Sequence, residues 1–230
     1  MSISELHQMA ALDNAALCTA MWRAHGLGEE SVEGCVACSG TPPRFYPNVV
    51  TVISDADPQD QMRWIAERAD HAPGPFFVKD SYRALRLDCC GFEPLFDARW
   101  IHRPAGLGSK VTQLNWRSLT TANELVAWEA AWSGSAEEPP VFLPAFLAQP
   151  AVTMLAGRSE GVIVAGCIVT TTGAVSGLSN VFGNAMEAVS AAAAAFPGRD
   201  LVGYESGDAL AAALRTGFQT VGDLIVWKRA

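Results

Sequence analysis

The feature that most constrains the fold of this 230-residue chain is a pattern that occurs twice. The two copies read FFVKDSYRALRLDCCGFEPLFDARWI and LVGYESGDALAAALRTGFQTVGDLIVW. Each pattern predicts a short strand, a short helix, a Gly-Phe pair and a longer strand. Glycine stops a helix in left-handed geometry, and the phenylalanine then re-enters the core. One repetition at this period predicts a supersecondary unit copied once, in place of a solenoid array.

The two copies align over several chemically similar positions. An offset of 126 residues takes Gly91-Phe92 to Gly217-Phe218. The further matches are Asp97 with Asp223 at the same offset and, after one residue of slippage, Asp80 with Glu205 and Trp100 with Trp227. The elements before each copy also correspond, which predicts a β-α-β-α-β order in both halves.

Hydrophobic periodicity, capping residues and turn residues predict the remaining elements. In the first half we expect helices at 4–25, 61–69 and 81–90, and strands at 32–38, 48–53, 76–79 and 92–102. In the second half we expect helices from 121 onward, at 185–195 and at 208–216, and strands at 152–156, 162–172, 174–182, 201–205 and 218–227. This order predicts an α/β protein (an α+β mixed sheet).

The glycine-rich stretch at 103–109 is the best linker candidate between the two patterned regions. We expect a first half at 1–105, a linker at 106–110 and a second half at 111–230. Half of the residues are apolar and 17% are charged, so either half has enough apolar material for a core.

The formal net charge of −8 disfavours nucleic acid and anionic membrane surfaces as partners. The first twenty residues have no basic start and no apolar signal core, and no stretch reaches the roughly twenty apolar residues that span a bilayer. We therefore expect a cytoplasmic protein with no membrane segment.

The six cysteines allow two interpretations. Cys35 and Cys38 have the spacing of half a zinc site, and Cys89-Cys90 could be imagined as the other half. Adjacent cysteines rarely reach one metal together, so we favour buried free thiols and no metal, with zinc as the alternative. The four histidines make no ligand pair at recognisable spacing.

At this point the second half, over about residues 111 to 230, resembles a GNAT N-acetyltransferase. The resemblance is carried by three antiparallel strands, a helix, a strand, and the closing segment VGYESGDALAAALRTGFQTVGDLIVW. The first half resembles a degenerate copy of the end of the same module. The resemblance implies a GNAT-like acyl-CoA N-acyltransferase fold with two related halves.

In that family the fourth strand splays from the fifth, and acetyl-CoA lies in the opening as a substrate. Its pyrophosphate sits on backbone N–H groups at the start of the next helix, within a motif R/Q-x-x-G-x-G/A. Here Asn180 stands where the motif has Arg or Gln, and the glycine is Gly183. The resemblance implies these cofactor-binding residues: Asn180, Val181, Phe182, Gly183, Asn184, Ala185 and, at the start of the last helix, Ser206.

Many members of the family carry a tyrosine four residues before the glycine of the Gly-Phe pair, as the acid for the departing thiolate. That position here is Ala213, which cannot donate a proton. Tyr204 and Glu205, at the end of the preceding strand, are the candidate catalytic residues. Their ordinary alternatives are a core tyrosine and a carboxylate that caps the following helix. For Gly183 the ordinary alternative is a structural glycine that lets the chain turn into the next helix.

The leading hypothesis is an N-acetyltransferase that moves an acetyl group from acetyl-CoA to a small-molecule amine, with a homodimer allowed for. The alternative is a catalytically silent GNAT-like module that binds a ligand or a protein. Seven tryptophans suggest an aromatic pocket at first sight, but Trp128 and Trp132 fall at helical core spacing, so we expect packing. No nucleophile elbow, Walker loop or Rossmann fingerprint is present in the sequence.

Overall fold

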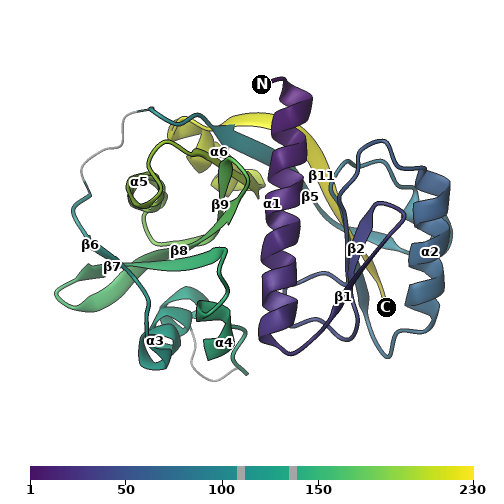
Figure 1. Cartoon of the computed structure of the whole chain (residues 1–230), viewed down its shortest axis with the longest axis horizontal. Helices are drawn as coiled ribbons and strands as arrows, with labels where there is room; N and C mark the ends of the chain where they lie inside the picture. The colour runs from purple at the N-terminus through teal and green to yellow at the C-terminus, as the bar shows by residue number, and fades with distance from the viewer. Residues whose placement is uncertain (108–111, 135–138) are drawn as a thin grey trace.

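A computed structural model describes residues 1–107, 112–134 and 139–230. The expected linker at 106–110 lies partly outside the described residues. The described strands form one eleven-stranded mixed sheet with the order β1-β2-β3-β4-β11-β5-β10-β9-β8-β7-β6. In Figure 1, helix α1 runs between the β6–β9 side of this sheet and the side that carries α2.

The first half of the chain begins with the long helix α1 and then alternates short strands with one helix. Its elements are α1 (Ile3–Ala24), β1 (Glu29–Val32), β2 (Cys35–Cys38), β3 (Val49–Thr51), α2 (Pro58–Asp70), β4 (Phe76–Asp80), the 3-10 turn η1 (Leu87–Cys90) and β5 (Glu93–Arg103). Ser2 and Glu5 form a capping box at the start of α1, and Asp57 caps α2, which explains where these helices begin.

The second half follows the predicted order closely. Its elements are β6 (Asn115–Ser118), α3 (Ala122–Ser133), α4 (Pro144–Leu147), β7 (Val152–Ser159), β8 (Val162–Thr172), β9 (Val175–Phe182), α5 (Ala185–Ala195), β10 (Asp200–Glu205), α6 (Gly207–Arg215) and β11 (Gln219–Arg229). Thr121 and Glu124 form the capping box that starts α3. Strand β6 and helix α4 were not predicted.

The sheet is symmetric about its central antiparallel pair, β5 and β11. Ala98 faces Leu224 there, and these two residues are separated by the same 126-residue offset as the Gly-Phe pairs. Outward from that pair, β11 lies against β4 and β5 lies against β10, both antiparallel. Then β4 pairs with β3 and β10 with β9, both parallel. Each half therefore places its last strand between two strands of the other half.

Helices cover both faces of the sheet. Helices α1, α3 and α4 share one face, where α1 packs on Trp100, Val202 and Leu224. Helices α2, α5 and α6 lie on the opposite face, over two clusters that contain Ile225 and Ile101. None of the described helices combines the length and apolar character needed to cross a bilayer.

The single strand predicted at 32–38 is wrong. The structure has a hairpin there, β1 and β2, which pairs Val32 with Cys35. Its two turn residues, Glu33 and Gly34, have φ values of 52° and 73°. Two consecutive positive φ angles are the geometry of a tight hairpin turn that matches the strand twist. The prediction overlooked this turn because Glu33 is an unusual residue for it.

The helix predicted at 81–90 is also wrong, apart from the 3-10 turn at its end. The carboxylate of Asp80 accepts hydrogen bonds from the amides of Ala84 and Leu85, at 3.2 and 2.9 Å. Arg83 has a φ of 53°, which no right-handed helix allows. The segment is therefore a loop that folds back on the buried Asp80, and Gly91 ends it with a φ of 78°.

The match of Trp100 with Trp227 is corrected by the sheet. Trp100 lies on the face covered by α1, whereas Trp227 lies on the face covered by α2. A slip of one residue in a strand exchanges the two faces, so the equivalent of Trp227 is Ile101, at the 126-residue offset. Both tryptophans are buried and pack in the core, as expected.

The same alternation separates the cysteines of β2. Cys35 packs in the cluster beside α2, and Cys38 packs in the cluster beside α1. Two residues three apart in a strand point to opposite faces, so these thiols do not converge on one metal. In the described part of the chain, no group of three or more His, Cys, Asp or Glu side chains is placed to hold a metal ion.

Candidate functional site

The neighbouring parallel strands β9 and β10 separate part-way along their length. Their paired residues end at Gly177 and Val202, although β9 continues to Phe182 and β10 to Glu205. Beyond this point each strand stays paired with its outer neighbour, β9 with β8 and β10 with β5. The opening is therefore built into the sheet, because the two outer partners hold the strands apart.

A bulge in β9 lies beside the opening. The register with β8 shifts between Ser179 and Phe182, and Asn180 inside this stretch has a φ of 50°. A bulge leaves a residue out of the ladder and bends the strand. Residues held in such uncommon backbone conformations concentrate at functional sites.

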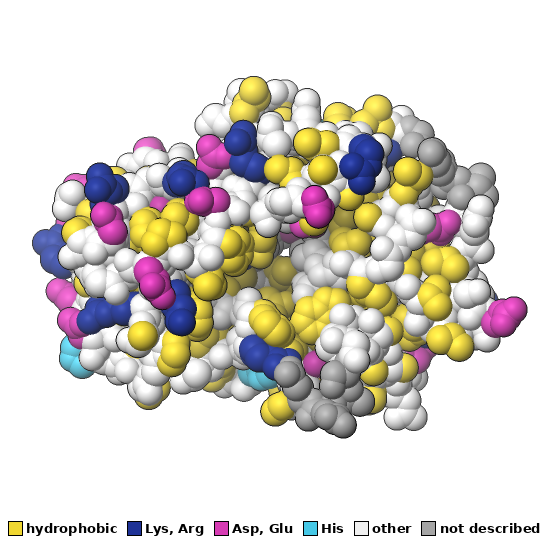
Figure 2. Space-filling view, turned by 180° about the vertical axis from the view of Figure 1, so that it is seen from behind, with side chains coloured by type: hydrophobic (Ala, Val, Ile, Leu, Met, Phe, Trp, Pro, Cys, Tyr) yellow, Lys and Arg dark blue, Asp and Glu magenta, His cyan; other side chains and the backbone are white. Residues whose placement is uncertain are grey.

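Two cavities meet at the opening. One has a volume of about 140 Å³ and lies on the α5 and α6 side, where Gly183, Ala185 and Ala213 line it. The other has a volume of about 270 Å³ and reaches toward α1. Glu205 and Val181 line both cavities. Figure 2 shows the molecule hollowed near its centre, with hydrophobic side chains around the hollow.

Glu205 stands at the junction of the two cavities. Burial raises the pKa of Glu205 to about 6. Among the described residues no side chain or amide makes a hydrogen bond with its carboxylate, and it does not cap α6, whose cap residue is Ser206. A carboxylate with a pKa near neutrality and no structural partner is suited to accept a proton from a ligand.

Tyr204 faces Lys79 on the α1 side of the sheet. The Lys79 Nζ donates to the Tyr204 hydroxyl at 3.4 Å and to Asn14 Oδ1 at 2.6 Å. It also lies 4.4 Å from the centre of the Tyr204 ring. Burial opposes the ammonium form of Lys79, but Tyr204 and Cys18 outweigh it, so the net shift of the Lys79 pKa is upward. Because the Tyr204 hydroxyl accepts from Lys79, its own proton remains available to another acceptor.

An apolar groove continues from this pair. It has a volume of about 510 Å³, and its lining includes Pro42, Phe45 and Phe96 as well as Lys79 and Tyr204. We call this cavity the Lys79 groove. Four residues, Phe45, Tyr46, Lys79 and Tyr204, line both this groove and the cavity that reaches Glu205. Lys79 was not predicted from the sequence, where its one signal is its place before Asp80, the residue that the repeated pattern aligns with Glu205.

The equivalent place in the first half is closed. There, β3 and β4 stay paired up to Val50 and Lys79, whereas the corresponding strands of the second half have already separated. The Ser81 amide then donates to Thr51 Oγ1 at 2.8 Å, and Asp80 is occupied by the loop amides described above. One opening therefore serves the described part of the sheet.

With this geometry in view, three solved structures are informative. A GCN5-related N-acetyltransferase from Kribbella flavida superposes with a TM-score of 0.63 and 14% identity, over 96% of this chain and 95% of that one. An acetyltransferase of the GNAT family from Novosphingobium aromaticivorans gives 0.53 and 11%, over 92% and 96%. A conserved protein of unknown function from Staphylococcus epidermidis gives 0.54 and 9%, over 84% and 83%.

The chain has the GNAT fold. At these identities the likeness concerns the fold alone. No family model matches the sequence, and no curated protein matches it. The resemblance implies an opening between the fourth and fifth strands of the module. The structure has this opening between β9 and β10, and it begins after the last pair, Gly177 with Val202.

The GNAT fold brings only some of the expected cofactor residues to the opening. Val181, Gly183 and Ala185 line the 140 Å³ cavity, and Asn180 lines the cavity on the α1 side. The Phe182 ring points elsewhere, because it packs edge-on against Trp128 at 5.1 Å. Ser206 lines a separate surface pocket with Arg83 and Asp97.

Backbone amides at the start of α5 already donate hydrogen bonds within the chain. The Asn184 Oδ1 accepts from the amides of Met186 and Glu187, at 3.0 and 3.3 Å. The Glu187 carboxylate accepts from the Gln113 amide and from Trp116 Nε1, at 2.8 and 3.1 Å. These hydrogen bonds give Glu187 a lowered pKa against the effect of its slight burial. An anion at this helix start would compete with Asn184 and would meet a negative charge.

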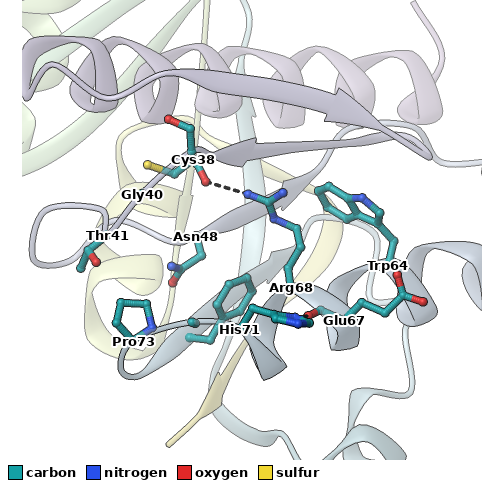
Figure 3. Close-up of a pocket in the computed structure, with 12 residues that line it drawn as sticks. Cys38, Gly40, Thr41, Asn48, Trp64, Glu67, Arg68, His71 and Pro73 are labelled. Carbon is teal, nitrogen blue, oxygen red and sulfur yellow. Dashed lines mark hydrogen bonds between the residues drawn. The ribbon is translucent and has the colours of Figure 1, made fainter.

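A further cavity of about 490 Å³ lies away from the opening, between the end of β2 and the end of α2. Figure 3 shows Arg68 at its centre, donating to the Cys38 carbonyl oxygen at 3.0 Å. Arg68 also pairs with Glu30 and lies over the Trp64 ring. Its charge is thus satisfied inside the protein, and the arrangement is that of a structural tie between α2 and the β1–β2 hairpin.

Proposed function

We propose that this chain is an acyl-CoA-dependent N-acyltransferase that moves an acetyl group from acetyl-CoA to a small-molecule amine. The observation that carries the proposal is the separation of β9 from β10, with a cavity on each face of the sheet and Glu205 between them. The GNAT fold supports the same activity class. Acetyl-CoA would act as a substrate and supply the thioester.

The chain's own residues would divide the work as follows. Glu205 accepts a proton from the acceptor's ammonium group, since a pKa of about 6 leaves it mostly ionised at neutral pH. The amine nitrogen then attacks the acetyl carbonyl carbon, and the carbon–sulfur bond breaks. Tyr204 donates a proton to the departing thiolate, the role that the family's tyrosine would have at Ala213. The attacking nitrogen loses its second proton as the amide forms, and this proton restores the Tyr204 hydroxyl.

The cavity on the α5 and α6 side would receive the thiol-bearing arm of the substrate. Its walls include the small residues Gly183, Ala185, Ala209, Ala212 and Ala213. Of the other expected cofactor residues, Asn180 and Val181 would flank this arm along β9. Phe182, Asn184 and Ser206 are engaged elsewhere and have no part in the proposed binding. We further propose that residues 1–105 are a degenerate copy of the same module as residues 111–230, joined by a linker at 106–110.

Calorimetry with acetyl-CoA tests this proposal. Saturable heat, and release of free CoA thiol when a panel of amines is added, is the expected result. No heat at millimolar acetyl-CoA would remove the transferase function.

A second candidate is a catalytically silent module that binds a ligand or a protein. Two observations favour it: Ala213 replaces the expected acid, and Asn184 occupies the amides at the start of α5. This candidate predicts acetyl-CoA binding without thiol release, or neither. Steady thiol release with any amine would exclude it.

A further inference from the structure

Lys79 carries a buried positive charge that the described residues do not neutralise. Lys79 is only 5% exposed, and it forms no ion pair with any of the described residues. Its hydrogen-bond partners are Asn14 Oδ1 and the Tyr204 hydroxyl, and neither is a carboxylate. A buried charge is costly unless it is paired, so an anionic ligand that reached this ammonium group would be stabilised by it.

The cavity beside Lys79 is apolar and open at its rim. Phe45, Leu95 and Phe96 line it although 69%, 49% and 40% of their surfaces are exposed. Phe45 is also held at a φ of 72°, an uncommon conformation for a bulky residue. The volume of about 510 Å³ lies in the range of small-molecule pockets. Besides Lys79 at the base, the lining includes the cationic residue Arg44, which lies over the Phe45 ring. An apolar pocket with positive charge selects a ligand with an apolar body and a negative charge.

We propose that the Lys79 groove binds an apolar carboxylic acid, with its aromatic ring or branched chain against Phe45 and Phe96 and its carboxylate on Lys79 Nζ. In so far as the proposed function holds, this acid is the acceptor itself, an aromatic or branched-chain amino acid. Its amino group would then reach Glu205 through the cavity that shares Lys79 and Tyr204 with the groove.

Calorimetry without acetyl-CoA tests the binding step by itself. The probes are 3-phenylpropanoate and its neutral amide, 3-phenylpropanamide, added to the full chain. We expect the acid to bind at least about tenfold more tightly, because a charge-assisted contact is stronger than a neutral one. Equal affinities, or no binding of the acid, would overturn the proposal. This comparison needs no substitution, so it stands even if a variant fails to fold.

Three variants test which side chains contact the two probes. Lys79→Met keeps the length of the side chain and should abolish the preference for the acid. The control is Lys228→Met, which removes the same charge from β11 at a residue that does not line the groove. Phe96→Ser, at the exposed rim, should weaken both probes equally. A preference for the acid that survives Lys79→Met would contradict the assignment.

A separate assay connects the groove to the proposed function. Thiol release from acetyl-CoA is compared with phenylalanine and with 2-phenylethylamine, which lacks the carboxylate. We expect a preference of at least about tenfold for phenylalanine, lost in Lys79→Met. Acid binding without thiol release for any amine would refute the transferase and leave the groove intact. Equal release from both amines would refute the groove as the acceptor site.

Discussion

Lys79 Nζ and the Tyr204 hydroxyl lie 3.4 Å apart, although 125 residues separate them in the sequence. Lys79 faces Val226 of β11, and Tyr204 faces Trp100 of β5, so the two residues occupy equivalent places on either side of the central strand pair. Strands β5 and β11 each lie between two strands of the other half, and this arrangement brings Lys79 and Tyr204 together. A residue of the first half thereby enters the site of the second.

The Tyr204 hydroxyl can be removed without disturbing the sheet. In Tyr204→Phe, Lys79 keeps Asn14 Oδ1 as a partner and the ring remains packed edge-on against Trp100, at 5.5 Å. We expect the free energy of unfolding to change by about 1 kcal/mol or less, and thiol release to fall by about 10²-fold or more if the hydroxyl is the acid. Tyr82→Phe, which removes a hydroxyl bound to Gln8, is the control and should retain activity. Unchanged turnover in Tyr204→Phe would assign the acid elsewhere.

Glu205 should set the acidic limb of the pH–rate profile. Burial raises its pKa to about 6, so the base form is lost as the pH falls through that value. The rate constant kcat/KM should then decrease about tenfold per pH unit below 6. Glu205→Gln should lower kcat by roughly 10² to 10⁴ and remove that limb. Asp223→Asn, which breaks an exposed ion pair with Arg99 at 2.7 Å, should leave the profile in place.

Asp13 should make the protein more stable in mild acid. Burial raises its pKa to about 7 against the hydrogen bond from Thr170, and one of its oxygens, Oδ1, has no partner among the described residues. The folded state therefore holds a proton that the unfolded state releases near pH 4. The stabilisation is complete below about pH 4 and is lost as the pH rises through about 7.

Asp13→Asn should flatten this dependence, and denaturant unfolding between pH 5 and 8 measures it. Asp200→Asn is the control with the opposite sign. Burial raises the pKa of Asp200, but the Ala105 amide and His102 outweigh it and lower the net value. Its contribution is lost only as the pH falls below about 4, outside the measured window. A wild-type stability that rises from pH 5 to 8 would contradict the assignment to Asp13.

Gly183 is required by the backbone geometry between β9 and α5. A Cβ there would lie 2.4 Å from the Val164 carbonyl oxygen, and the φ of Gly183 is 73°. Gly183→Ala should destabilise the protein by several kcal/mol, by strain and by collision together. Gly198 has a φ of 79° with no atom near its Cβ position, so Gly198→Ala isolates the strain, roughly 1–2 kcal/mol. A similar decrease in the free energy of unfolding for both variants, measured with denaturant, would show that β8 shifts to accommodate the added methyl group.

The sequence allowed local structure to be predicted far better than the site. The bounds of α5 were predicted without error, because Asn184 caps it and Phe196-Pro197-Gly198 closes it. The resemblance implied an opening between the strands predicted at 174–182 and 201–205, but it could not say that their pairing ends at Gly177, since a motif gives a position along the chain and no strand register.

Lys79 and Asn14 could not have been found in that way. Lys79 reaches Tyr204 only because β4 pairs with β11 and β10 with β5, and strand partners more than 100 residues apart leave no local pattern. Asn14 comes to Lys79 from α1, whose orientation across the sheet is a product of tertiary packing. The period of the repeat indicated which positions correspond, but not that corresponding side chains meet.

The cavity on the α5 and α6 side offers the most direct test of where acetyl-CoA lies. Ala209 lines this cavity and is exposed, so Ala209→Phe can fill the 140 Å³ space without repacking the core. Ala211, two residues further along α6, is also exposed but does not line the cavity. Successive residues two apart in a helix point to different sides, which makes Ala211→Phe a matched control. By calorimetry we expect acetyl-CoA affinity to fall at least tenfold in Ala209→Phe and to stay near wild type in Ala211→Phe. If both variants bind equally well, the arm of acetyl-CoA does not pass between α5 and α6, and the opening between β9 and β10 serves the acceptor alone.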